Sequence, residues 1–298
     1  MSHSHQFVAL FGLFFSSCVH AVEFFADALY WHTTEAIDWV YANDQHLPNQ
    51  TITYKTLSFD FEPGFRLGIN SQGNCKAALY YTRFHTHSSD AVFGNVISGF
   101  ISDRIANFPN GHFFQAGQIN IAIDYNMFDV DLSKSFYFGE RVIFAPMLGI
   151  RGGWINQKIQ STFQGSVSAV ENVKNDFIGL GPKAGVDTQL SLFCANNTDF
   201  GLFADFSVSY LWGHWKIRDV YVDTTPATVR VIVPSRHIGA LATQAILGLH
   251  FNHKDLSIKL GYEIMDWFEQ CQFFDNGTGA HSNNLVLQGY TFRLSYSL

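Results

Sequence analysis

Eleven charged residues fall on one face of apolar, alternating segments, and their spacing predicts a charged lining rather than a catalytic centre. Side chains of a strand point to opposite faces with a period of two, so charges and apolar groups separate. By this register the inward residues are Asp60, Glu62, Arg66, Arg83, Asp124, Lys183, Asp187, Asp205, Lys259, Glu263 and Arg293. A ring of both signs inside a β-barrel would select solutes that cross a pore. The alternative is mutual ion pairing that fills a narrow barrel, because buried charges must be paired.

Residues that support catalysis are present, but they form no motif. A ten-stranded outer-membrane protease would carry Asp and His at its outer rim, and the candidates are Asp38, Asp90, Asp219, His214 and His237. No G-x-S-x-G, zinc signature or phosphate-binding loop occurs. His85 and His87 share a strand face, and His112 follows across a long loop. Two His at this spacing could hold a metal, but no Cys, Asp or Glu completes a metal set nearby. We predict no enzyme activity, no cofactor and no metal site.

The elements that must position the charges are long strands. Apolar and polar residues alternate without a break over 57–69 and 290–298. Thirteen alternating residues in 57–69 exceed a typical soluble strand and suit a tilted strand that crosses a bilayer. Further strands are predicted at 76–87, 119–126, 200–212 and 256–264, with less regular ones near 23–34, 140–158, 174–193 and 236–252.

Connector lengths provide an independent signal. Long polar connectors are predicted at 35–51, 88–111, 159–173, 217–235 and 270–284, and short ones at 70–74, 132–139, 194–199 and 252–255. Long and short connectors alternate, as extracellular loops and periplasmic turns do in outer-membrane barrels. The pattern predicts an all-β fold: a closed antiparallel transmembrane barrel of about ten strands, with both ends of the chain on the periplasmic side.

The same register predicts which side chains meet lipid. The expected lipid-facing residues are Phe59, Phe61, Phe206, Val208, Tyr210, Leu260, Phe292 and Leu294. An aromatic belt at the membrane interface is expected from Tyr30, Trp31, Trp154, Trp212, Trp215, Trp267 and Phe268.

Composition agrees with one membrane barrel over 22–298. Charged residues make up only 14% and aromatic residues 16% of the 298 residues, and the mean hydropathy is +0.03. Strands in which strongly apolar and polar residues alternate have a mean hydropathy near zero. The formal net charge of -7 argues against a nucleic-acid partner, which would need a basic face.

Residues 1–21 are expected to be a cleaved export signal. An apolar core at 7–15 is too short for a membrane helix, and Val19 and Ala21 fit the cleavage site, although the preceding residues carry no Lys or Arg. Lipoprotein processing at Cys18 is the weaker alternative. Cys75, Cys194 and Cys271 would remain, which allows at most one internal disulfide, and none has metal-ligand spacing.

Four segments, 28–31, 59–68, 175–185 and 287–294, resemble the Legionella-type major outer membrane protein family, also likened to chlamydial major outer membrane proteins. The resemblance extends over nearly all of the chain after residue 21. It implies a porin-like barrel in the outer membrane of a Gram-negative cell, exposed at the surface. The chain departs from the family in its few cysteines and in ending on Leu298 rather than on Phe or Trp.

The expected function is therefore passive diffusion of small solutes and ions, with surface loops exposed. Outer-membrane lipid, small solutes, a homo-oligomer and host-surface contacts through the loops are the partners considered. A barrel of about ten strands lies near the size that side chains fill. A non-conducting structural protein or adhesin with a salt-bridged lumen is thus the alternative, and a protease is less favoured.

Overall fold

The computed structural model describes residues 22–35, 37–44, 51–73, 75–98, 114–224, 228–232, 239–275 and 279–298. The predictions for the export signal, Cys18, His112 and His237 lie outside these residues. Within the described part of the chain, no helix is long and apolar enough to cross a membrane.

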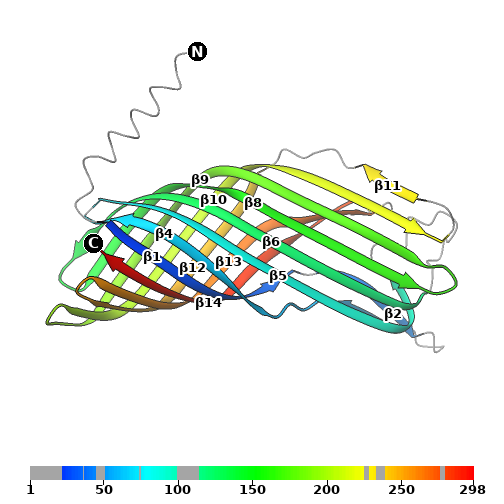
Figure 1. Cartoon of the computed structure of the whole chain (residues 1–298), viewed down its shortest axis with the longest axis horizontal. Helices are drawn as coiled ribbons and strands as arrows, with labels where there is room; N and C mark the ends of the chain where they lie inside the picture. Colours follow the sequence, from blue (N-terminus) through cyan, green and yellow to red (C-terminus); the bar gives the residue numbers. More distant parts are fainter. Residues whose placement is uncertain are drawn as a thin grey trace, which may run out of the picture.

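Ten long strands form one closed antiparallel barrel, as the sequence predicts (Figure 1). The strands are β1 (Val22–Thr34), β4 (Phe61–Ser71), β5 (Cys75–Ser98), β6 (Phe114–Lys134), β8 (Val142–Gln164), β9 (Ala169–Ala195), β10 (Thr198–Asp223), β12 (Gly239–His253), β13 (Leu256–Asp275) and β14 (Gly279–Ser297). Each strand pairs with the next in chain order, and β1 pairs with β14 from Glu23↔Ser297 to Thr34↔Val286. This last pairing closes the barrel, so the ten strands leave no open sheet edge.

Four short strands extend the rims. They are β2 (Asp38–Asp44), β3 (Thr51–Thr56), β7 (Phe136–Phe138) and β11 (Thr228–Ile232). In Figure 1, β1 begins and β14 ends at one end of the barrel, whereas β2 and β11 lie at the opposite end. We call these the terminal end and the far end.

Connectors at the terminal end are tight turns, and Asn196, Asn197 and Lys254 adopt the left-handed conformation that such turns use. Where the structure describes the long polar connectors predicted at the far end, they are largely strand, which corrects their predicted bounds. β8 and β9 absorb most of 159–173, and their connection is reduced to 165–168. These segments are polar on one face only, so they continue the sheet in water instead of leaving it.

The polarity of the two faces is exchanged part-way along each long strand. On the inner face of β6, Ile119, Ile123 and Met127 are fully buried, whereas Asp129 and Asp131 follow on the same face. On its outer face, polar Asn120 is succeeded by the apolar residues Phe128, Val130 and Leu132. The pairing of β6 with β8 continues through this point without a register shift. The strand therefore keeps its geometry while its environment changes.

Solvent on the outside explains the exchange. Towards the terminal end, apolar groups point outward to lipid and polar groups line the inside, as a membrane barrel requires. Towards the far end, the barrel is surrounded by water, so polar groups point outward and apolar groups pack inside. We call these parts the membrane half and the protruding half.

Outward aromatic side chains mark the boundary between the halves. Tyr81 stacks on Phe128 with ring centroids 4.5 Å apart, and Phe128 lies 6.2 Å from Trp154 on the next strand. Tyr30 and Trp212 also point outward and are exposed. By contrast, the predicted belt residues Trp31, Trp215 and Trp267 are fully buried inside the barrel, because their strand positions have the opposite parity.

Most of the predicted lipid-facing residues are exposed on the outer face: Phe61, Phe206, Tyr210, Leu260, Phe292 and Leu294, with Val208 half-exposed. Phe59 is a correction. Residues 57–60 precede β4 and do not form a strand, and Leu57 and Phe59 turn into the apolar core. Unbroken alternation in the sequence thus spans a point where the apolar residues change from the inside, at Phe59, to the outside, at Phe61.

Candidate functional site

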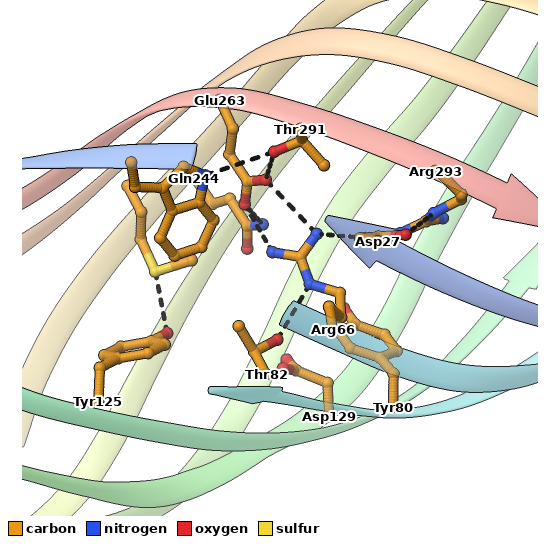
Figure 2. A network of polar contacts seen from close by, with 12 residues as sticks. Asp27, Arg66, Tyr80, Thr82, Tyr125, Asp129, Gln244, Glu263, Thr291 and Arg293 are labelled. Carbon is orange, nitrogen blue, oxygen red and sulfur yellow. Dashed lines mark hydrogen bonds and ion pairs between the residues drawn. The ribbon is translucent and has the colours of Figure 1, made fainter. Parts of the chain in front are cut away.

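A buried guanidinium group occupies the middle of the lumen (Figure 2). Arg66 on β4 donates from Nη1 to Asp27 Oδ2 at 3.0 Å and from Nη2 to Glu263 Oε1 at 2.7 Å. Its Nε donates to Thr82 Oγ1 at 3.0 Å. Asp27 comes from β1 and Glu263 from β13, so one side chain joins strands that are not neighbours in the sheet.

Both carboxylates have further partners. Arg293 donates from Nε and Nη2 to the two oxygens of Asp27 at 2.7 and 2.8 Å. Glu263 accepts from Thr291 Oγ1 at 2.7 Å and from Gln244 Nε2 at 2.6 Å. Charge-assisted contacts of this kind are the strong ones, and two-point contacts also fix geometry.

A second charge cluster lies across the lumen. Arg151 Nε donates to Asp129 Oδ1 at 2.7 Å, and Lys183 Nζ lies 3.1 Å from that oxygen and 2.9 Å from Asp131 Oδ2. Tyr80 OH donates to the same Asp131 oxygen at 2.8 Å. These side chains come from β5, β6, β8 and β9.

Gln244 joins the two clusters. Its Oε1 accepts from Arg151 Nη2 at 2.6 Å, while its Nε2 donates to Glu263. Together the ion pairs contain four carboxylates and four cations: Asp27, Asp129, Asp131, Glu263, Arg66, Arg151, Lys183 and Arg293. We call them the lumen network. The formal charges of the network cancel. Its residues come from strands around the whole barrel, so the network connects opposite walls of the lumen.

An apolar layer covers the lumen network on the side of the far end. Phe177 packs against Trp215 with ring centroids 4.3 Å apart, and Tyr125 meets Trp267 edge-on at 6.0 Å. Trp31, Trp215 and Trp267 have at most 1% of their surface exposed. These residues belong to one continuous core of the protruding half, so the lumen there is packed rather than open.

Towards the terminal end the lumen widens into a cavity of about 510 Å³. Gln72 and Lys254 from the tight turns line its mouth, and Arg66 and Gln244 lie at its inner end. Asp187 and Asp205 line its wall and are directly opposite each other on β9 and β10. We call this space the vestibule.

Seven of the predicted lining residues point into the lumen. Arg66, Lys183, Glu263 and Arg293 belong to the network, and the vestibule wall holds Asp187, Asp205 and Lys259. Sequence reasoning missed four network members: Asp27, Asp129, Asp131 and Arg151. Each lies an even number of residues from other inward residues of its strand. In the protruding half that same face carries apolar residues, so the sequence does not identify it as a polar, inward face.

Three predicted lining residues are wrong. Arg83 points outward and is exposed, opposite Phe65 on the outer face of β4. Asp124 also points outward, because Tyr125 occupies the inner face at that position. Asp60 is exposed in the non-strand segment before β4. Glu62 is half-buried and lies 3.8 Å from exposed His87, outside the lumen network.

The described histidine and protease candidates are spread over both faces of several strands. His85 lies 2.8 Å from Asp124 on the outer surface, and the described residues contain no group of three metal-ligating side chains. His214 and Asp219 point to opposite faces of β10, with Asp219 buried inside. The other two protease candidates that the structure describes lie on different strands, Asp38 on β2 and Asp90 on β5.

The described cysteines are free thiols. Cys75 and Cys194 are exposed near the terminal end, and Cys271 is buried in the protruding half. The internal disulfide that the sequence allowed is therefore not formed among them.

The protruding half, outside the membrane, holds a buried carboxyl group whose pKa is shifted. Glu35, between β1 and β2, accepts from Gln157 Nε2 at 2.7 Å, and Gln157 Oε1 accepts from Asn175 Nδ2 at 3.0 Å. Burial raises the pKa of Glu35 to about 7, and contacts with Cys271 and Gln157 offset this only partly.

The Glu35 pKa predicts that stability falls with rising pH. Between the ordinary value of 4.5 and about 7, the unfolded chain releases the proton while the folded chain keeps it. We expect Glu35→Gln to be more stable than the wild type at pH 8, by up to about 3 kcal/mol, and equal to it at pH 4. Urea unfolding at both pH values measures this. If the free energies of unfolding of Glu35→Gln and the wild type differed by the same amount at pH 4 and pH 8, the prediction would be contradicted.

Comparison with known proteins gives the family. A family model for the Legionella pneumophila major outer membrane protein precursor matches residues 17–298. A comparison with curated proteins found no significant match.

Three solved structures show low similarity. The outer membrane protease OmpT of Escherichia coli is 8% identical, with a TM-score of 0.45, and the alignment covers 94% of this chain and 97% of that one. The toluene transporter TodX of Pseudomonas putida is 9% identical with a TM-score of 0.33, covering 95% and 90%. The transport unit of the Escherichia coli autotransporter AIDA-I is 8% identical with a TM-score of 0.30, covering 95% and 92%.

The family match covers nearly the whole chain and agrees with the segments that resemble the family in the sequence. The closed barrel with an apolar outer band is the architecture that such a membrane location requires. The protein is an outer-membrane β-barrel and belongs to the Legionella pneumophila major outer membrane protein family.

Proposed function

We propose that this protein is a non-conducting barrel that anchors a rigid, surface-exposed structure in the outer membrane. The proposal replaces diffusion through the lumen as the expected activity. The observation that carries it is the filled interior: the lumen network closes the membrane half, and the apolar core fills the protruding half.

The network geometry argues against a water-filled passage. Arg66 and Asp27 have side chains at most 3% exposed, and Glu263 is fully buried. A porin lining would keep such charges hydrated and available to ions. Here each charge is compensated by protein partners, and a solute would have to break several charge-assisted contacts to pass.

The vestibule supports the same conclusion. It ends at Arg66 and Gln244, below the apolar layer. Short turns of outer-membrane barrels lie in the periplasm, so the vestibule opens on that side and the far end is extracellular. A periplasmic solute that enters it meets a closed inner end.

The protruding half supplies the proposed surface structure. Its strands continue the barrel beyond the aromatic boundary, with a polar outer face and a packed core. Such an extension holds its rim strands in fixed positions, as a platform for contacts with other surfaces would require. An adhesin is one use of that platform.

Single-channel recording of the refolded protein in a planar bilayer tests the proposal. We expect no stable current steps, because no hydrated path connects the two sides. Migration of unheated protein on SDS gels verifies folding, and a known porin refolded in the same way serves as the positive control. Reproducible porin-sized steps from verified barrels would overturn the proposal.

A further inference from the structure

A row of three cations crosses the outer surface of the protruding half. Lys158 on β8 is directly opposite Lys174 on β9, and Lys174 is directly opposite Arg218 on β10. All three side chains are exposed. We call Lys158, Lys174 and Arg218 the basic row.

Like charges directly opposite each other on neighbouring strands repel and destabilise a sheet. Among the residues that the structure describes, no carboxylate forms an ion pair with any member of the basic row. On the same face Lys216 is opposite Asp176, and Asp124, which pairs with His85, lies in the same cross-strand row. Counted with both carboxylates, the patch keeps a net charge of about +2. The whole chain has a formal net charge of -7. The local concentration of cations therefore runs against the composition of the protein, and an external anion would relieve the repulsion.

The basic row lies just beyond the aromatic boundary, on the side of the far end. Lys158 follows Trp154 by four residues on the same face, and Trp154 lies at the aromatic boundary. Four residues of a tilted strand rise by roughly 10 Å. Lys and Arg side chains extend towards a membrane interface, so the amino and guanidinium groups reach the headgroup layer just outside the hydrocarbon.

The opposite side of the barrel has no such row. Four residues beyond Tyr262, Tyr290 and Tyr30 on β13, β14 and β1, the outward positions in direct register are Asp266, Val286 and Thr34. The side formed by β13, β14 and β1 therefore lacks the cations that β8, β9 and β10 carry at this distance from the aromatic boundary. A uniform electrostatic attraction to the membrane would not need this placement.

We propose that the basic row, supported by Lys216, binds the phosphate groups of phosphorylated glycolipid in the outer leaflet. The match is one of charge and depth: fixed cations with no carboxylate partner face a layer that carries phosphates. Each Lys or Arg near an anionic membrane surface strengthens binding, so three together are expected to strengthen it about a hundredfold. This inference does not depend on whether the lumen conducts.

The test uses the folded full-length barrel in a neutral detergent, titrated with lipid A. Binding is followed by the rise in the temperature at which the barrel unfolds on SDS gels. For the variant Lys158→Gln/Lys174→Gln/Arg218→Gln we expect binding of lipid A about a hundredfold weaker than for the wild type. The control variant Lys134→Gln/Arg141→Gln/Lys254→Gln removes three exposed cations near the terminal end and should bind as the wild type does.

Two further measurements separate lipid binding from a structural role. Without lipid A, the basic-row variant should unfold at the same temperature as the wild type or higher, because the repulsion is gone. Lipid A stripped of its phosphates should give no rise. The proposal fails if the basic-row variant binds within threefold of the wild type, or if the control variant loses binding equally. It also fails if stripped lipid A, or inorganic phosphate at the same concentration, stabilises the wild type as well as lipid A does.

Discussion

Replacing Arg66 with glutamine is expected to destabilise the barrel by about 3–5 kcal/mol, because Asp27 and Glu263 would keep buried charges with fewer partners. Urea unfolding in lipid vesicles, followed by tryptophan fluorescence, measures the loss. Current should be absent before and after the substitution, since the apolar layer remains in place.

Two further variants refine the Arg66 experiment. Lys76→Gln removes an exposed cation at the vestibule and should change stability by no more than about 0.5 kcal/mol. Arg66→Gln/Glu263→Gln should recover part of the loss, because the remaining Asp27 still pairs with Arg293. A cost below about 1 kcal/mol for Arg66→Gln would mean that water replaces the guanidinium group, and it would favour an open lumen.

An arginine at position 132 is expected to destabilise the barrel by about 2–4 kcal/mol, whereas one at position 120 should change stability by no more than about 0.5 kcal/mol. Leu132 and Asn120 lie on the same outer face of β6, and both are exposed. Lipid surrounds the first and water the second, so only Leu132→Arg places a charge in hydrocarbon.

Unfolding of both β6 variants in the same vesicles measures the difference. Because face, strand and introduced side chain are matched, intrinsic strand preference contributes little to it. Equal costs would contradict the division into a membrane half and a protruding half. The comparison also locates the membrane boundary that places the basic row near lipid headgroups.

The interiors of the two halves differ because their surroundings differ. In the membrane half, lipid contact requires an apolar exterior, and the interior is left to polar groups that must satisfy one another. In the protruding half, the apolar core supplies the hydrophobic stabilisation that a soluble domain would have. The protein thus combines a charge-paired interior in the membrane half with a water-exposed extension of the same ten strands.

The sequence alone predicted the strand architecture. Alternation at segments such as 200–212, 256–264 and 290–298, together with alternating long and short connectors, predicts an antiparallel barrel of about ten strands, and the structure has ten. These features are local: period two separates the faces of a strand, and turn composition marks its end. The family was recognisable for the same reason, since its segments are contiguous in the chain.

Only the tertiary structure decided which face is inside and what surrounds it. Period two shows that the faces differ, but an apolar face meets lipid in one half and the barrel interior in the other. Asp124 was therefore assigned to the lumen, although Tyr125 occupies that side. The partners of Arg66 were equally hidden, because Asp27 and Glu263 are 39 and 197 residues away in the chain. Closure of the barrel brings them together, and the low dielectric of the filled lumen makes their pairing necessary.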